Sequence, residues 1–289
     1  FTWIGISNVA PQGVVPDSVI YSFYIGAAIL ILCVIYTTVK VKEMPPAEYA
    51  ESHGITEEEE KEKINMVKLL VKAPKAFWTV GLVQFFCWFA FMFMWTYTNG
   101  SVAANVFDAP TVETAVNGVS KVMLDTKSIH YQDAADWVGV LFAVQAIGSV
   151  LWAVCIPLFK DRKLIYSLSL VLGGLGFIST YFVHNQYVLF ISFLLIGCAW
   201  AAMLALPFTI LTNALSGGHM GTYLGLFNGT ICIPQIVAAS LGGSILALFT
   251  PKGMLPPEIN MLVMAGVMLI IGAVCVYFIK ETKGEQVKA

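Results

Sequence analysis

The chain has 289 residues, of which 58% are hydrophobic and only 12% are charged, and its formal net charge is −2. A soluble domain carries about twice this share of charged residues, so the composition excludes a surface that faces water on all sides. The nearly neutral charge excludes the basic field of a nucleic-acid-binding protein. We therefore expect an integral membrane protein.

The cysteines lie singly within apolar stretches. No two of them form a CxxC pair, and no His stands beside one at metal-ligand spacing. We interpret them as buried thiols that pack as small hydrophobic side chains, and we expect no disulfide, no metal and no cofactor. They are Cys33, Cys87, Cys155, Cys198, Cys232 and Cys275.

Long apolar segments predict the fold class. A helix needs about 20 consecutive apolar residues to cross roughly 30 Å of hydrocarbon. Seven segments meet this criterion, none contains an acidic or basic residue, and all are too long for barrel strands. The prediction is an all-α membrane protein. The segments are Val19–Val39, Phe77–Thr98, Trp137–Phe159, Leu164–Val183, Tyr187–Asn213, Gly221–Phe249 and Ile259–Ile279.

The basic residues predict how the chain crosses the membrane. If the loop after the first span is cytoplasmic and the spans alternate, 13 of the 16 Lys and Arg residues lie inside. The positive-inside rule favours this orientation. The inside residues are Lys40, Lys42, Lys61, Lys63, Lys68, Lys72, Lys75, Lys160, Arg162, Lys163, Lys280, Lys283 and Lys288; the outside ones are Lys121, Lys127 and Lys252.

Residues 41–76 form the longest predicted cytoplasmic connection. Thr56 and Glu59 have the spacing of a capping box, and apolar residues then recur at helical spacing. This pattern predicts a short amphipathic helix against the membrane or the bundle, with the acidic run 57–60 as a solvated first turn. An outside loop runs from about Gly100 to Asp136, and neither connection is long enough for a catalytic domain. The apolar residues are Ile64, Val67, Leu70 and Val71.

The order of these elements indicates a part of a larger protein. We divide the sequence into a non-cytoplasmic lead-in (1–16), the last helix of an amino-terminal half (17–40), a cytoplasmic central loop (41–76), a carboxyl-terminal six-helix bundle (77–280) and a cytoplasmic tail (281–289). The chain begins at Phe1 without a Met, and we expect a twelve-helix protein that lacks its first five helices. Within the last six spans, residues 87–94 align with residues 199–206, which agrees with inverted repeats of three helices each.

Polar and aromatic residues share one face of the second span. Gln84, Trp88, Phe91 and Trp95 recur there at helical spacing. An amide that bonds hydroxyls in both directions, together with indoles that stack on a pyranose ring, suits a sugar. A packing stripe, with Trp95 in the interfacial aromatic belt, explains the tryptophans equally well. For Gln84 the functional interpretation is favoured.

The third span carries Gln145, Ser149 and Trp152 on one face. Substrate contacts and interhelical hydrogen bonds explain this pattern equally well. On the fifth span, Pro207 lacks a backbone N–H, so it frees a carbonyl oxygen and permits a bend.

The sixth span contains two kinds of signal. The first is a glycine ridge that predicts close helix packing. The second is Asn228 and Gln235, which share a face with Pro234 interrupting the helix between them, and for which we favour substrate or gating contacts. No carboxylate lies within any span, so ion coupling resides in a missing part or is absent. The ridge consists of Gly221, Gly225 and Gly229.

Several strings resemble one family. Residues 84–90 (QFFCWFA), continuing to residues 95–100 (WTYTNG), resemble the seventh helix of sucrose and other glycoside permeases in the major facilitator superfamily. Residues 197–201 and 206–207 look like the tenth helix of this group, and residues 225–228 and 233–235 look like the eleventh. Residues 159–163, which include Asp161 and Arg162, are similar to the short basic loop after the eighth helix.

The resemblance implies a fold and a function. The seven spans would be the sixth to twelfth helices of two six-helix bundles that rock about a central cavity. The group moves sucrose, maltose or related glycosides, often in symport with a proton or a sodium ion. Plant-type members commonly have an Asp where this chain has Asn99, so the resemblance carries no coupling role to that position.

Our leading hypothesis is a sugar permease of the cytoplasmic membrane that works by alternating access, with no enzymatic activity. Helices absent from this chain would form the wall opposite the predicted site. A seven-helix receptor is the first alternative, although Ile259–Ile279 lacks the Lys that a retinal protein requires. A membrane enzyme ranks last, because the sequence has no HExxH, GxSxG or intramembrane acid pair. The predicted substrate-binding residues are Gln84, Trp88, Trp95, Gln145, Asn228 and Gln235.

Overall fold

The computed structural model describes residues 5–6, 15–42, 45, 48, 66–116, 119–215 and 220–279. In this part of the chain, 7 helices are long and apolar enough to cross a membrane. The chain separates into two compact units, Phe1–Glu62 and Lys63–Ala289. The predicted all-α fold class and its seven spans are confirmed.

The first unit contains helix α1 (Asp17–Lys40). Asp17 lies in its first turn and Lys40 in its last turn, where each charge interacts favourably with the helix dipole. The hydroxyls of its interior bond back to the preceding turn: Ser22 Oγ donates to Ser18 O at 2.7 Å, and Thr37 Oγ1 donates to Cys33 O at 2.9 Å. Its polar side chains are therefore satisfied within the helix, as a membrane span requires.

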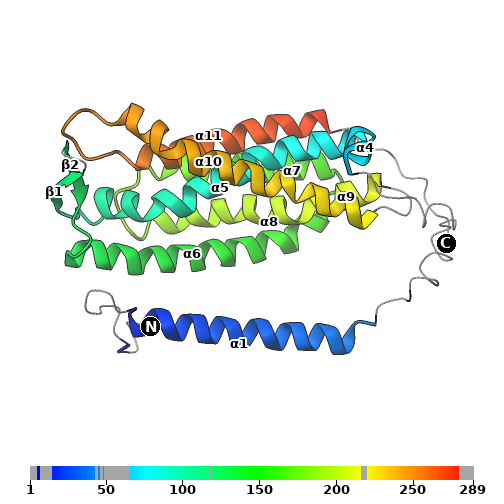
Figure 1. Cartoon of the computed structure of the whole chain (residues 1–289), viewed down its shortest axis with the longest axis horizontal. Coiled ribbons are helices and arrows are strands. Elements are labelled where there is room, and N and C mark those ends of the chain that lie inside the picture. Colours follow the sequence, from blue (N-terminus) through cyan, green and yellow to red (C-terminus); the bar gives the residue numbers. More distant parts are fainter. Residues whose placement is uncertain are drawn as a thin grey trace. The chain divides into compact units, whose positions relative to one another are not determined.

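The second unit is a helical bundle with a small β-hairpin at one end and α4 at the other (Figure 1). Two short 3₁₀ helices continue α6 and α11, at Ile156–Leu158 and Val276–Phe278. The elements are α4 (Met66–Val71), α5 (Lys75–Asn105), β1 (Thr111–Val116), β2 (Val119–Leu124), α6 (Ile129–Cys155), α7 (Arg162–Ser179), α8 (Leu189–Ala214), α9 (Met220–Phe227), α10 (Gly229–Phe249) and α11 (Ile259–Cys275).

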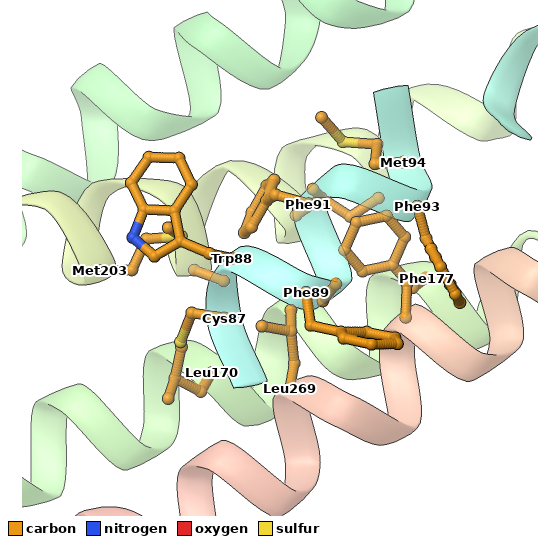
Figure 2. Close-up of a cluster of buried hydrophobic side chains, with 14 of the residues drawn as sticks. Cys87, Trp88, Phe89, Phe91, Phe93, Met94, Leu170, Phe177, Met203 and Leu269 are labelled. Atoms are coloured by element: carbon orange, nitrogen blue, oxygen red, sulfur yellow. The ribbon is translucent and has the colours of Figure 1, made fainter. Parts of the chain in front are cut away.

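Helix α5 is the centre of this bundle. It packs against α6, α8, α10 and α11, and 67% of the residues in its most apolar 18-residue stretch are buried. Its aromatic side chains meet Leu170 and Phe177 of α7, Met203 of α8 and Leu269 of α11 in one apolar cluster (Figure 2). Lipid is as apolar as these side chains, so close packing rather than exclusion of water holds the helices together.

Glycines allow the closest helix crossings. A Cβ atom built on Gly174 of α7 would lie 2.9 Å from Gly266 O of α11, and one built on Gly266 would lie 2.6 Å from Gly174 O. On α8, a Cβ atom at Gly197 would lie 2.8 Å from Ser149 N of α6. At these crossings a methyl group would meet backbone, which cannot move aside as a flexible side chain can.

The connection between α5 and α6 is shorter than predicted. Helix α5 continues to Asn105, because Ser101 Oγ donates to Tyr97 O at 2.7 Å and Asn105 Nδ2 donates to Ser101 O at 2.8 Å. These polar residues end the apolar segment without ending the helix.

Between the helices, β1 pairs with β2 in antiparallel register, Thr111 opposite Leu124. The hairpin was not predicted, although its strands flank an Asn-Gly dipeptide, the strongest short-range hairpin signal.

The sixth span is interrupted at Asn228, which separates α9 from α10. Pro234 lies inside α10, so the predicted interruption between Asn228 and Gln235 is displaced to Asn228 itself. Glycine has a low helix propensity, and Gly229 follows the break directly. Thr230 Oγ1 donates to Phe227 O at 2.7 Å and so satisfies a carbonyl at the end of α9.

Part of the predicted cytoplasmic helix is present as α4. Tyr223 Oη of α9 donates to Leu69 O at 3.2 Å, and Leu70 packs against the apolar core, so α4 lies against the bundle. Thr56, Glu59, the acidic run 57–60 and Ile64 lie outside the described residues, as do residues 281–289 and most of the lead-in 1–16.

The glycine ridge of the sixth span has no neighbouring helix in the described bundle. No atom lies within 4 Å of a Cβ atom built on Gly221 or Gly225, and Gly229 would meet only Ile233 of its own span, at 3.9 Å. Close packing on this ridge therefore stays a prediction about a partner outside the described residues.

These two environments predict opposite effects of the same substitution. Gly197→Ala should destabilise the protein by about 1–3 kcal/mol, because the added methyl group overlaps the backbone of α6. In the chain alone, without the neighbour predicted to cover the ridge, Gly225→Ala should be neutral or stabilising by up to about 1 kcal/mol, because alanine has the higher helix propensity and the space is open. Thermal unfolding in detergent measures both, and equal effects would contradict the assignment of the crossing.

Candidate functional site

The candidate site begins with one hydrogen bond between α5 and α8. Gln84 is fully buried, and its Nε2 donates to Met203 O at 3.2 Å. In an α-helix, the oxygen of residue 203 would accept from the N–H of residue 207, but Pro207 has none. The carbonyl that Pro207 leaves free is therefore the one that Gln84 satisfies.

This bond also fixes which way the Gln84 amide points. With Nε2 on Met203 O, its Oε1 is buried and has no hydrogen-bond partner among the described residues. Trp88, one turn further along α5, is 8% exposed, and its Nε1 likewise has no partner there. An unsatisfied buried polar atom costs about 1–3 kcal/mol, so this acceptor and this donor, one helical turn apart in sequence, are candidates to bind a ligand or water.

An aromatic cluster surrounds these atoms. Its members are Trp88, Phe91 and Trp95 of α5 and Trp200 of α8. The Trp200 ring centroid lies 5.9 Å from that of Trp88, 4.9 Å from Phe91 and 5.8 Å from Trp95. The Trp88 ring lies over α8 beside Met203 (Figure 2). Trp95 is 44% exposed, so the cluster has a buried side and an open side.

Trp200 was not among the predicted site residues, yet it contacts every other member of the aromatic cluster. The signal was present in the sequence, because the alignment of residues 87–94 with 199–206 pairs Trp88 with Trp200. The structure brings these two residues into contact. Trp95 also packs within the cluster rather than standing alone at an interface.

Helix α6 borders the cluster. Gln145 is 7% exposed, and a Cβ atom on Gly197, one turn from Trp200, would collide with its carbonyl oxygen. Trp152 Nε1 donates to Ser169 Oγ of α7 at 2.8 Å, which supports the structural interpretation for this residue.

Asn228 and Gln235 form a separate exposed group. Phe227, beside Asn228, packs on Phe77 and Phe208, with ring centroids 5.6 and 5.8 Å away. The side chain of Asn228 is exposed and that of Gln235 is partly buried. No hydrogen bond or ring contact of the described residues joins either one to Gln84 or to the aromatic cluster. The thiol of Cys232, which is exposed, lies between them on the same helix.

The basic stretch after α6 has a structural role. Asp161 Oδ1 accepts hydrogen bonds from Lys163 N at 2.9 Å and Leu164 N at 3.1 Å, so Asp161 caps the amino terminus of α7. Such a cap satisfies two backbone donors that have no partner within the helix. Arg162 is the first residue of α7 and is exposed.

Two residues near the hairpin end complete the picture. Asn99 Nδ2 donates to Tyr131 Oη of α6 at 2.9 Å, while its Oδ1 is buried and has no partner among the described residues. Glu258, which precedes α11 and which the sequence analysis overlooked, lies against Gly100 of α5. Glu258 directly precedes the last predicted span, so it does not count among the carboxylates within spans.

This architecture is that of a multi-pass membrane protein, in which polar and aromatic groups lie between packed helices. A family model described as Major Facilitator Superfamily matches residues 102–289, more than half of the chain, and the chain belongs to that superfamily. Members bind small molecules and are transporters rather than enzymes; nothing in the described residues favours the receptor alternative. No curated protein matches the chain.

The bond between α5 and α8 can be tested with a double-mutant cycle. Gln84→Leu should cost about 1–3 kcal/mol of stability, because it leaves Met203 O buried without a donor. In a Pro207→Ala background the same change should cost less, because residue 207 then has an N–H that can satisfy Met203 O. Equal costs in the two backgrounds, measured by unfolding in detergent, would show that Pro207 and Gln84 are independent.

The native Cys232 reports on the surface that Asn228 and Gln235 share. If this surface faces water, a membrane-impermeant maleimide should label Cys232 in intact membranes, since a thiol must be solvent-accessible to react. A Cys232→Ser variant gives the background. Wild-type labelling no higher than that background would place the surface against lipid or protein and remove both residues from the site.

Proposed function

We propose that this chain is the carboxyl-terminal part of a sugar permease, which moves a glycoside or disaccharide across the cytoplasmic membrane by alternating access. The observation that carries the proposal is an aromatic cluster together with two buried polar atoms, Gln84 Oε1 and Trp88 Nε1, that have no hydrogen-bond partner among the described residues. Membership of the superfamily supports transport of a small molecule, and the resemblance to glycoside permeases supports the class of that molecule.

The chemistry of a sugar suits this arrangement. A pyranose ring has an apolar face that packs on an indole, and the open side of the Trp95 ring offers one. Its hydroxyls both donate and accept, so one could donate to Gln84 Oε1 and another could accept from Trp88 Nε1. Each bond would remove the cost of leaving a buried polar atom unsatisfied.

The remaining predicted residues fit the proposal as a second contact area. Gln145 on α6 and Gln235 at the exposed part of α10 would contact other hydroxyls, with Asn228 beside the break between α9 and α10. Helices outside this chain would supply the opposite wall, including the neighbour that the ridge at Gly221 and Gly225 predicts. On this proposal, proteoliposomes that contain the chain alone should take up no labelled disaccharide.

Substitution of Trp95 tests the site directly. In the intact protein, Trp95→Ala should weaken disaccharide binding by about fivefold to tenfold, the value of one aromatic stacking contact, while Trp95→Phe should retain most of it. Because Trp95 is partly exposed, neither change should prevent folding. Intrinsic fluorescence titrations with sucrose and maltose give the affinities without requiring transport.

Trp78→Ala is the matched control, because Trp78 is an exposed tryptophan of the same helix outside the aromatic cluster. It should leave the affinity unchanged. If Trp95→Ala binds disaccharides as well as the wild type does, or if the intact wild type binds no sugar, the proposed function is wrong.

A further inference from the structure

Glu258 lies at the contact between the start of α11 and α5. It is the residue directly before α11, and its carboxyl group faces the backbone of Gly100. A Cβ atom built on Gly100 would lie 2.8 Å from Oε1 of Glu258 and closer still to Oε2. Any Cβ atom at this position would displace the carboxyl group from where it lies, so glycine permits this contact of the partly buried Glu258 side chain.

Nothing among the described residues neutralises this carboxyl group. Glu258 forms no ion pair and no side-chain hydrogen bond there, and although it precedes a helix it does not cap it. Tyr97 faces it from α5 and interacts with it electrostatically. Other titratable groups lie at the same end of the bundle. They include Asp108 after α5, His130, Tyr131, Asp133 and Asp136 of α6, Tyr181 and His184 after α7, and Lys252 before Glu258.

Burial without a compensating charge favours the neutral acid over the carboxylate. For Glu258, desolvation raises the pKa from 4.5 to about 7. The neutral and charged forms of this side chain are therefore both populated near neutral pH, which is uncommon for a glutamate.

Glu258 is partly buried, so its side chain keeps some contact with the surroundings of the bundle. A cleft of about 440 Å³ opens at the same end of the bundle. Pro257 and Ile259, the residues on either side of Glu258, both line it, and so do Asn260 and His184. Glu258 itself does not line this cleft, so its carboxyl group would have to leave Gly100 to enter it.

We propose that Glu258 is a proton-binding site that controls how the start of α11 packs on α5. The protonated carboxyl group lies against Gly100, and the carboxylate leaves this contact for the water of the cleft. The ligand is a proton, whichever solute the protein carries, so the proposal stands or falls separately from the sugar site.

The stability of the protein should depend on pH accordingly. Below about pH 4.5 the carboxyl is protonated in the folded and unfolded states, and the full stability is present. Between about pH 4.5 and 7 the unfolded state loses its proton first, so stability falls as pH rises, and above about pH 7 this contribution changes no further.

Infrared spectroscopy of the purified chain in lipid nanodiscs tests the proposal. We expect a carboxylic-acid C=O band that disappears with a midpoint near pH 7 and that is absent from Glu258→Gln. His184→Gln is the matched control, because His184 lines the neighbouring cleft and has no carboxyl group; this variant should keep the band and its midpoint.

Two further results decide the outcome. Glu258→Gln should remove the fall of the unfolding temperature between about pH 4.5 and 7, because the amide cannot ionise. Gly100→Ala should move the infrared midpoint towards 4.5, because the methyl group displaces the carboxyl group into water. A wild-type midpoint near 4.5, or a band that persists in Glu258→Gln, would overturn the proposal.

Discussion

The bond from Gln84 to Met203 O is the interaction on which the candidate site depends. Pro207 removes a hydrogen bond from α8 in the membrane, where no water replaces it, and the amide of α5 restores the missing donor. The two helices are thereby held at one register, which sets Trp88 and Trp95 against Trp200. In the same bond, Nε2 of Gln84 is used to hold the two helices together, and its Oε1 remains available as an acceptor for the proposed ligand.

In the proposed site, residues from two aligned segments of the chain lie together. The two spans that lead the three-helix units each carry a tryptophan at the aligned position, and in the folded chain these rings touch. Two residues that correspond in the repeat thus contribute from opposite helices to one cluster. Trp88 is buried and Trp95 is exposed, so the cluster is closed on the side of α8 and accessible on the other side.

Much of the fold could be predicted from the sequence, because a span must be long, apolar and free of charge. The ends of the helices could not, since Ser101 and Asn105 satisfy themselves within α5 and extend it beyond the apolar segment. For the candidate site, helical spacing grouped Trp88 and Trp95, whose rings pack together, while the binding role of Gln84, Trp88 and Trp95 stays a prediction. Helical spacing could not reveal Trp200 or Glu258, because both contact α5 only through tertiary packing between distant parts of the chain.

The paired glycines of α7 and α11 have a mechanical consequence. Gly174 and Gly266 allow the backbones of α7 and α11 to pack closely, which favours movement of the two helices as one unit. The sixth span is built differently: α9 ends at Phe227, Asn228 follows, and built Cβ atoms on Gly221 and Gly225 meet no other described helix. We therefore expect a conformational change to be largest at Asn228, where α9 could change its angle to α10 while α7 and α11 keep their packing.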